Sequence, residues 1–202
     1  FSFIEYHIAL NNFTIFFSLV SIFLFMNSLN MMDGINLLAG LYCLILLIIL
    51  ILFSNFTLPI LFIVVGLLNF LILNYQNRIF LGDSGSIILS YIISYIVIKS
   101  YNIESVFFAD QIFLIMMIPG LDLVRVAISR MLRGKNPLSG DRDHLHYLLS
   151  DKYNPSIAVL FILSLILIPI LINFQIGHTV SIILSSFLIY VITILYLKIS
   201  KK

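Results

Sequence analysis

The sequence predicts an all-α integral membrane protein, a polytopic bundle of about seven transmembrane helices in one membrane domain that covers residues 1–202. Composition is the first reason: 61% of the residues are apolar and 10% are charged, whereas soluble domains are nearer half apolar and a quarter charged. The second is that long charge-free stretches reach the roughly 20 residues that cross a bilayer. The third is that Lys and Arg gather on one side of those stretches. A soluble globule, a disordered tail and a nucleic-acid-binding module are therefore excluded.

Charge-free stretches and the polar breaks within them place the helices. Gly34–Asn77 and Tyr153–Leu197 are each long enough for two helices. The turn-forming segments Ser54–Pro59 and Asn173–His178 divide them. The predicted spans are residues 11–27, 35–53, 59–76, 85–101, 109–128, 156–173 and 179–197.

The distribution of basic residues predicts the orientation of these spans. Lys99 is the one basic residue among the connections on one side, and the ten other Lys and Arg residues fall on the opposite side. The positive-inside rule places the basic side in the cytoplasm, with the amino end outside and the carboxyl end inside. The long connection at residues 129–155 is then a cytoplasmic loop. Most other polar residues fall on the same side, so we expect function at the cytoplasmic face of the inner membrane, beside the lipid.

Polar residues recur at every third position at the cytoplasmic end of the first span: Asn27, Asn30, Asp33 and Asn36. Because an α-helix repeats every 3.6 residues, a continuous helix would carry Asn27 and Asn36 to opposite sides. Gly34 predicts that the helix ends there and that a new one starts near residue 35 or 36, with free N–H groups that form an anion site. The alternative is a polar helix end with a capping Asp and a turn Gly.

A second polar motif, Phe80-Leu81-Gly82-Asp83-Ser84-Gly85-Ser86, leads into the fourth span. Glycines on both sides of Asp83 allow a ligand to approach the backbone, and a carboxylate is a hard oxygen donor that suits Mg²⁺. Ser84 and Ser86 are expected to cap the helix that follows. The simpler interpretation is a helix cap after a glycine turn, with Phe80 in contact with lipid or core.

The predicted cytoplasmic loop carries Asp141-Arg142-Asp143-His144-Leu145-His146. Two alternating histidines are a weak zinc signal, and beside Arg142 they favour phosphate or sugar contacts. The alternative is a solvated loop with surface ion pairs. Pro119 is expected to break or bend the fifth span and to bring Asp122 to the same surface. Together these acidic and histidine groups predict one magnesium-dependent site for a phosphorylated, nucleotide-like substrate.

The order of the motifs resembles the polyprenyl-phosphate N-acetylhexosamine-1-phosphate transferases of glycosyltransferase family 4. The resemblance spans the whole chain and rests on Asn27-x-x-Asn30-x-x-Asp33-Gly34, then Leu81-Gly82-Asp83-Ser84-Gly85-Ser86, then Pro119-x-x-Asp122, then Asp141-Arg142-Asp143-His144-Leu145-His146. It implies transfer of a UDP-activated N-acetylhexosamine 1-phosphate to a polyprenyl phosphate with release of UMP. The expected pathway is cell-envelope polysaccharide synthesis, including lipopolysaccharide. The expected cofactor is Mg²⁺, with Mn²⁺ as its substitute, and a second copy of the chain is a candidate partner.

The resemblance also implies roles for individual residues. Asp83 is expected to ligate the metal, and Phe80 to lie against the uracil. Arg142 and the two histidines are expected to hold the phosphosugar end. The implied catalytic residues are Asp33, Asp83, His144 and His146, and the implied substrate-binding residues are Asn27, Asn30, Gly34, Asn36, Phe80, Asp122 and Arg142.

The chain departs from the family pattern at three points. Asn36 and Leu37 stand where the family often has Asp and Gly, and Tyr147 stands where many members have another His. The adjacent Asp-Asp pair of the family is absent from the sequence, which begins with Phe1. These features predict an amino-terminally truncated chain that is inactive alone. The competing interpretations are a catalytically inactive relative that acts as a membrane binding or scaffold protein, and a transporter.

Overall fold

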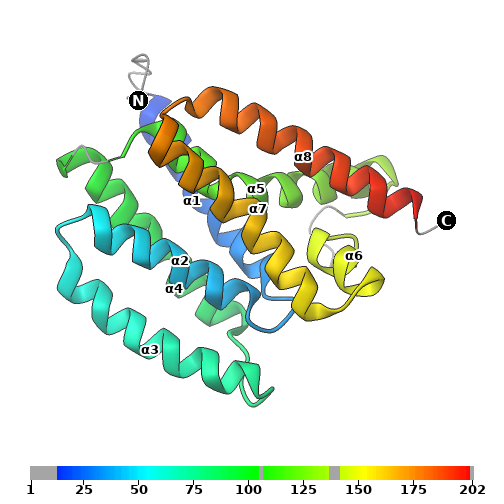
Figure 1. Cartoon of the computed structure of the whole chain (residues 1–202), viewed down its shortest axis with the longest axis horizontal. Coiled ribbons are helices and arrows are strands. Elements are labelled where there is room, and N and C mark those ends of the chain that lie inside the picture. The colour runs from blue at the N-terminus through cyan, green and yellow to red at the C-terminus, as the bar shows by residue number, and fades with distance from the viewer. Residues whose placement is uncertain (1–12, 105–106, 137–141, 201–202) are drawn as a thin grey trace. The chain divides into compact units, whose positions relative to one another are not determined.

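The computed structural model describes residues 13–104, 107–136 and 142–200. Over these ranges the chain is helical and contains no strand, which confirms the predicted all-α class (Figure 1). The helices are α1 (Phe13–Met32), α2 (Leu38–Phe53), α3 (Thr57–Tyr75), α4 (Gly82–Lys99), α5 (Ala109–Leu132), α6 (Leu145–Lys152), α7 (Pro155–Ile176) and α8 (Thr179–Ile199). A short π-helical segment, η1 (Ser100–Glu104), follows α4.

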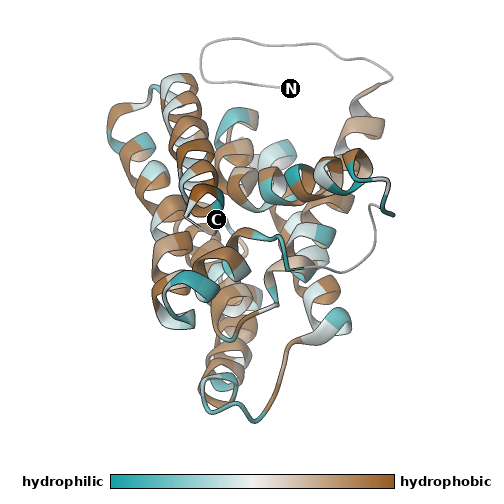
Figure 2. Cartoon of the chain, turned by 90° about the vertical axis from the view of Figure 1, so that its right-hand side faces the viewer, coloured by the Kyte–Doolittle hydropathy of each residue, from teal (hydrophilic) through white to brown (hydrophobic). Residues whose placement is uncertain are grey.

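Each of the seven predicted spans coincides with a helix, although residues 11 and 12 lie outside the described part. Among the residues that the structure describes, six helices are long and apolar enough to cross a membrane, namely α1, α3, α4, α5, α7 and α8. Helix α2 is apolar but has 16 residues. Figure 2 shows hydrophobic residues along most of the helices and hydrophilic ones at several helix ends. The protein is therefore a multi-pass membrane protein, and its orientation in the membrane stays a prediction.

The helices form two compact units, residues 1–113 and 114–202, and the boundary between them falls within α5. In the first unit α1 packs against α4, and α2 contacts both α3 and α4. In the second unit α6, α7 and α8 pack against one another. The single membrane domain expected for residues 1–202 stays a prediction.

The core of the first unit is built around α2. This helix is apolar on all its sides, and Leu38, Tyr42 and Leu47 on it are completely buried. Gly40 allows a close approach to α3, because a Cβ at this position would lie 2.7 Å from Leu71 Cδ2. By contrast, α1 and α3 expose many large apolar side chains, as expected for helices whose surroundings are lipid.

The structure corrects three local expectations. Helix α5 continues through Pro119 to Leu132, so the predicted break is absent, and membrane helices tolerate such a proline when nearby groups satisfy the freed carbonyl. The predicted loop at residues 129–155 contains the end of α5 and the helix α6. Helix α4 begins at Gly82 without a side-chain cap, so Ser86 lies inside the helix.

Candidate functional site

The first candidate site lies in the first unit, where the end of α1 meets the end of α3 and the start of α4. We call it the amide–carboxylate cluster. Its members are Asn30, Asp33, Asn36, Asn74, Asn77, Gly82, Asp83 and Ser86. They come from segments up to 56 positions apart that are joined by side-chain hydrogen bonds.

Asp33 joins the two sequence motifs. Its Oδ2 accepts a hydrogen bond of 2.9 Å from the backbone N–H of Gly82. Burial raises the pKa of Asp33, the Gly82 N–H partly offsets this, and the charge of Asp83 raises it further. The hydrogen bond to Gly82 brings Asp33 near the next residue, Asp83, whose charge affects the pKa of Asp33. Asp33 and Asp83 therefore form an acidic pair. These two motifs therefore meet, and the predicted single site that also includes the histidine motif stays a prediction.

A buried serine forms a second link between the same motifs. Ser86 is completely buried, and its hydroxyl donates to Asn30 Oδ1 at 2.8 Å. The same oxygen lies 2.9 Å from the Gly82 carbonyl and 3.0 Å from the Asp83 carbonyl. Asp83 itself is exposed, and its carboxylate makes no hydrogen bond to another residue in the described ranges. The packing of α1 against α4 thus places the exposed carboxylate of Asp83 beside the partly buried carboxylate of Asp33.

The segment between α1 and α2 is held in place by α3. The break in the helix occurs as predicted, but α2 starts at Leu38, two or three residues later than expected. Leu37 precedes it with a φ of 71°, a left-handed conformation that a non-glycine residue rarely adopts. Its N–H donates to Asn74 Oδ1 at 2.7 Å, so this N–H group is engaged by the protein and is not left for an anion.

Asn74 is the central residue of this arrangement. It is 2% exposed, and its Nδ2 donates to the Ile79 carbonyl at 2.9 Å and to Asn36 Oδ1 at 3.4 Å. Asn36 in turn donates to Asn77 Oδ1. Sequence analysis missed Asn74 and Asn77. Their spacing of three residues at the end of an apolar helix repeats the spacing of Asn30, Asp33 and Asn36 and could have identified them.

Replacing Asn74 by Leu is expected to destabilise the protein. The variant leaves the Leu37 N–H and the Ile79 carbonyl without their partner, and each buried unsatisfied group costs about 1–3 kcal/mol. Asn69→Leu is the matched control, because Asn69 is an exposed residue of α3 that bonds to the Val65 carbonyl of its own helix. Thermal unfolding of the detergent-solubilised protein should show a lower midpoint for Asn74→Leu alone. Equal midpoints for the two variants would contradict the role assigned to Asn74.

Two predicted residues of this region lie apart from the hydrogen-bonded cluster. Asn27 is exposed and donates to the Phe23 carbonyl of its own helix at 2.7 Å. Phe80 is 72% exposed. Gly34 lies in the turn between α1 and α2 and is half-buried. Their predicted contacts with the nucleotide stay predictions.

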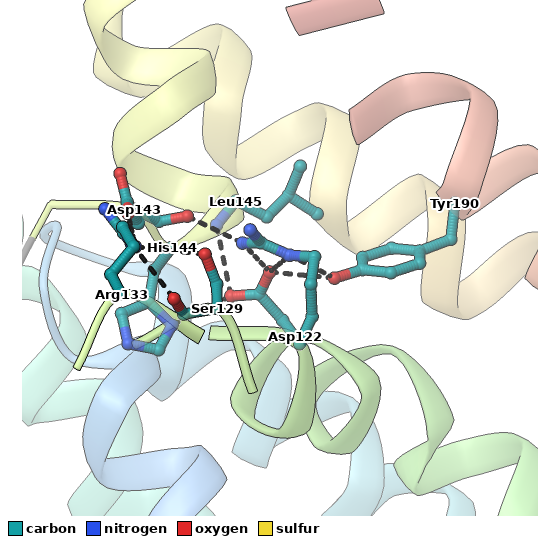
Figure 3. Close-up of polar contacts among 8 residues, drawn as sticks. Asp122, Ser129, Arg133, Asp143, His144, Leu145 and Tyr190 are labelled. Atoms are coloured by element: carbon teal, nitrogen blue, oxygen red, sulfur yellow. Dashed lines mark hydrogen bonds and ion pairs between the residues drawn. The ribbon is translucent and has the colours of Figure 1, made fainter. Parts of the chain in front are cut away.

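The second candidate site lies in the second unit, and Figure 3 shows the polar contacts around its residues Asp122, His144 and Tyr190. We call it the histidine cluster, and it consists of Asp122, Arg125, His144, His146 and Tyr190. The residues come from α5, from the start of α6 and from α8.

Asp122 is surrounded by hydrogen-bond donors. Its Oδ2 lies 2.9 Å from His144 Nδ1 and accepts the N–H of Leu145 at 3.1 Å. Its Oδ1 accepts from Arg125 Nη2 at 2.7 Å, from Arg125 Nε at 3.2 Å and from the Tyr190 hydroxyl at 2.9 Å. Both oxygens of this buried carboxylate are therefore engaged by the protein.

The two histidines are buried side by side. Each is 3% exposed, and their rings stack with centroids 5.7 Å apart. The Nε2 atom of each is buried and has no hydrogen-bond partner within the described ranges. Burial, with a smaller effect of the neighbouring His144, lowers the pKa of His146 to about 4. A buried polar atom without a partner needs an explanation, and a ligand atom is one that suits both histidines.

The other residues of the histidine motif lie nearer the surface. Arg142 is exposed, donates to Asp151 Oδ1 at 2.7 Å, and lies over the ring of Tyr147. Asp143 pairs with Arg133, and its backbone carbonyl accepts from Arg125 Nη2 at 2.6 Å. The alternative of a solvated loop thus fits Arg142 but is wrong for the buried histidines. Asp141 lies outside the described residues.

Arg125 and Tyr190 are further residues that sequence analysis missed. Arg125 follows Asp122 by three positions on a helix, which is the spacing of a side-chain ion pair and could have indicated it. Tyr190 is one tyrosine in a long apolar helix, and the sequence around it carries no signal of its role.

The donor set fits magnesium better than a metal that needs several protein ligands. No group of three or more His, Cys, Asp or Glu side chains within the described ranges could hold a metal ion. Mg²⁺ usually binds through one or two carboxylates and completes its coordination with water and substrate phosphates. Asp33 and Asp83 are a pair of that kind.

The sequence is similar to those of known proteins. A family model described as glycosyl transferase family 4 matches residues 1–101. The undecaprenyl-phosphate alpha-N-acetylglucosaminyl 1-phosphate transferase of Escherichia coli (strain K12) is 29% identical over 161 residues, which are 72% of this chain and 43% of that protein. The proteins of the same name from Salmonella typhi and Yersinia pestis are 30% and 28% identical, each over 41% of this chain and 23% of the relative. The chain thus spans less than half the length of these relatives. No solved structure matches it significantly.

Proposed function

The chain belongs to glycosyl transferase family 4, and from that premise we propose that it is part of an enzyme that transfers N-acetylhexosamine 1-phosphate from a UDP-sugar to a polyprenyl phosphate. An oxygen of the lipid phosphate attacks the phosphorus that carries the sugar. The bond from that phosphorus to the UMP oxygen breaks, which leaves polyprenyl-diphospho-sugar and releases UMP. The names of the similar proteins support a sugar-1-phosphate transferase acting on a polyprenyl phosphate.

The observation that carries the proposal is the meeting of Asp33 with Gly82 and Asp83. Phosphoryl transfer depends mostly on positioning the substrate and on neutralising its charge. Asp83 would hold Mg²⁺, with Mn²⁺ as a substitute, and the metal would neutralise charge on the diphosphate. Asp33 accepts the N–H of Gly82 and so holds the first residue of α4 in place. The exposed carboxylate of Asp83, the next residue, is thereby held at a fixed position.

The histidine cluster supplies groups that suit a phosphosugar, by the chemistry of its side chains within the second unit. The Nε2 atoms of His144 and His146 have no hydrogen-bond partner in the described ranges, and the exposed guanidinium of Arg142 suits a phosphate oxygen. We assign these residues to the phosphosugar, and Asn36, Gly34 and Phe80 to the nucleoside.

The lipid substrate accounts for the location of the protein. A polyprenyl phosphate keeps its tail in the bilayer and its charged group at the surface, which favours a site at the ends of membrane helices. The excess of Lys and Arg on one side supports a site on the cytoplasmic face of the inner membrane, with the amino end outside.

An inactive relative that binds the same ligands is the second candidate. The feature that raises it is that the sequence contains no adjacent Asp-Asp pair. Both the transferase and the inactive relative would bind the substrates, but only the transferase would convert them and release UMP.

The deciding experiment uses the complete protein in lipid nanodiscs with undecaprenyl phosphate, Mg²⁺ and either UDP-N-acetylglucosamine or UDP-N-acetylgalactosamine. Release of UMP that requires the lipid phosphate and is abolished by EDTA is the expected result. Binding of the UDP-sugar without release of UMP would establish the inactive relative instead.

A further inference from the structure

The hydrogen bonds around Asp122 assign it a task other than contact with substrate. We propose that Asp122 is a positioning residue that holds His144 through Nδ1 and thereby leaves Nε2 as the atom that meets the ligand. The tautomer part of this inference stands on the geometry alone. The kinetic part rests on the proposed function.

The proton on His144 Nδ1 follows from the neighbours of Asp122. An ionised carboxylate only accepts hydrogen bonds. The N–H of Leu145, two N–H groups of Arg125 and the hydroxyl of Tyr190 all point at this carboxylate. Such a set of donors holds Asp122 as an acceptor, so the remaining contact, from His144 Nδ1 at 2.9 Å, is an N–H donor as well. The partner of one ring nitrogen sets the role of the other.

The orphaned Nε2 supplies independent support. The His144 ring is buried, and its Nδ1 is engaged, whereas its Nε2 has no partner in the described part of the chain. If the ring served only to pack the second unit, an apolar side chain would fill the space without leaving a buried polar atom unsatisfied. In this arrangement a carboxylate accepts a hydrogen bond from one ring nitrogen of the histidine and orients the ring, which leaves the other nitrogen to contact a ligand.

Arg125 and Tyr190 fix the carboxylate itself. Tyr190 accepts from Arg125 Nε at 2.9 Å and donates to Asp122 Oδ1, so the two side chains form a closed set of hydrogen bonds around that oxygen. Arg125 also donates to the backbone carbonyl of Asp143, the residue before His144. The network therefore fixes both the ring and the backbone from which it comes (Figure 3).

The variant Asp122→Asn tests the inference without changing the size of the side chain. Three donors from Arg125 and Tyr190 hold the amide oxygen on their side, so the amide NH₂ takes the place of Oδ2. There it faces His144 Nδ1 as a donor, and the ring must give up its Nδ1 proton. The Leu145 N–H loses its acceptor at the same time.

The first measurement is the ¹⁵N NMR spectrum of the complete protein labelled at histidine and placed in nanodiscs. The His144 signals are those that disappear in His144→Gln. We expect a protonated Nδ1 in the unmodified protein and an unprotonated Nδ1 in Asp122→Asn. Asp143→Asn is the control with the same chemical change at the neighbouring carboxylate, which pairs with Arg133, and it should keep the Nδ1 proton. An unprotonated Nδ1 in the unmodified protein, or no change in Asp122→Asn, would overturn the inference.

The second measurement is transfer activity. Asp122→Asn should lower kcat/KM by about 100-fold or more, as loss of the carboxylate behind a working histidine does elsewhere. Tyr190→Phe keeps the aromatic ring and removes only the hydroxyl, so it should lower kcat/KM less than Asp122→Asn does. The control Tyr196→Phe, at an exposed site of α8, should have the kcat/KM of the unmodified protein. Unchanged kcat/KM in a folded Asp122→Asn protein would overturn the kinetic part. If the complete protein shows no transfer at all, the proposed function fails, and the NMR result still decides the tautomer.

Discussion

The variant Asp83→Asn in the complete protein is expected to reduce UMP release by at least about 1000-fold, which corresponds to about 4 kcal/mol of transition-state stabilisation. Thermal unfolding should stay unchanged. The Asp83 side chain is exposed and makes no hydrogen bond to another described residue, so its replacement removes no contact of the fold. An amide lacks the charge that a magnesium ion needs from its ligand.

Asp151→Asn is the matched control for this prediction. It makes the same change at a carboxylate whose partner, Arg142, is exposed, and such surface pairs contribute little to stability. Asp33→Asn is a poorer probe, because Asp33 also accepts the Gly82 N–H. Substantial UMP release by Asp83→Asn would contradict the assignment of the metal to Asp83.

The sequence was sufficient to predict the helices and the meeting of two motifs. Long apolar stretches have one stable structure in lipid, because a helix satisfies its own backbone groups. Asn30 and Asp33 recur at helical spacing next to a glycine, and Gly82 and Asp83 begin a span. These features predict two polar helix ends at one membrane face, and the hydrogen bond between Asp33 and Gly82 confirms that they meet.

The hydrogen-bond partners of the side chains that hold the two clusters in place were not predictable, because those partners are distant in the sequence. Asn74 accepts a hydrogen bond from the backbone N–H of Leu37, and Asp122 accepts one from the backbone N–H of Leu145, the first residue of α6. Neither α2 nor α6 has a side-chain cap from its own first turn. Each helix start is instead satisfied by a buried polar residue of another helix, and spacing along the chain carries no record of that pairing.

This shared arrangement connects the fold to the proposed chemistry. In water, the N–H groups at a helix start can bind solvent, but near a bilayer an unsatisfied group is costly. Asn74 and Asp122 meet this need, and in doing so they fix the segments that carry Asn36 and His144. The same two side chains thus contribute to stability and to the geometry of the candidate sites.

His146 gives the second large prediction, which concerns stability in acid. The folded protein holds the pKa of His146 at about 4, below the ordinary 6.5, chiefly because the ring is buried and also because His144 and Arg142 lie near it, against the opposing effect of Asp122. Between these two values the unfolded chain binds a proton that the folded protein rejects. The free energy of unfolding should therefore fall as the pH is lowered from 6.5 to 4, by up to about 3 kcal/mol from this group.

The variant His146→Gln isolates that contribution, because glutamine is uncharged throughout the range. Thermal midpoints of the complete protein in nanodiscs, measured at pH 7 and pH 4.5, should fall less in His146→Gln than in the unmodified protein. His178→Gln, at an exposed histidine before α8, should fall as far as the unmodified protein does. Because the comparison uses the change between two pH values, any destabilisation common to both cancels. Equal falls in all three proteins would show that His146 is not held neutral by its burial, and that its Nε2 is open to solvent rather than kept for a ligand.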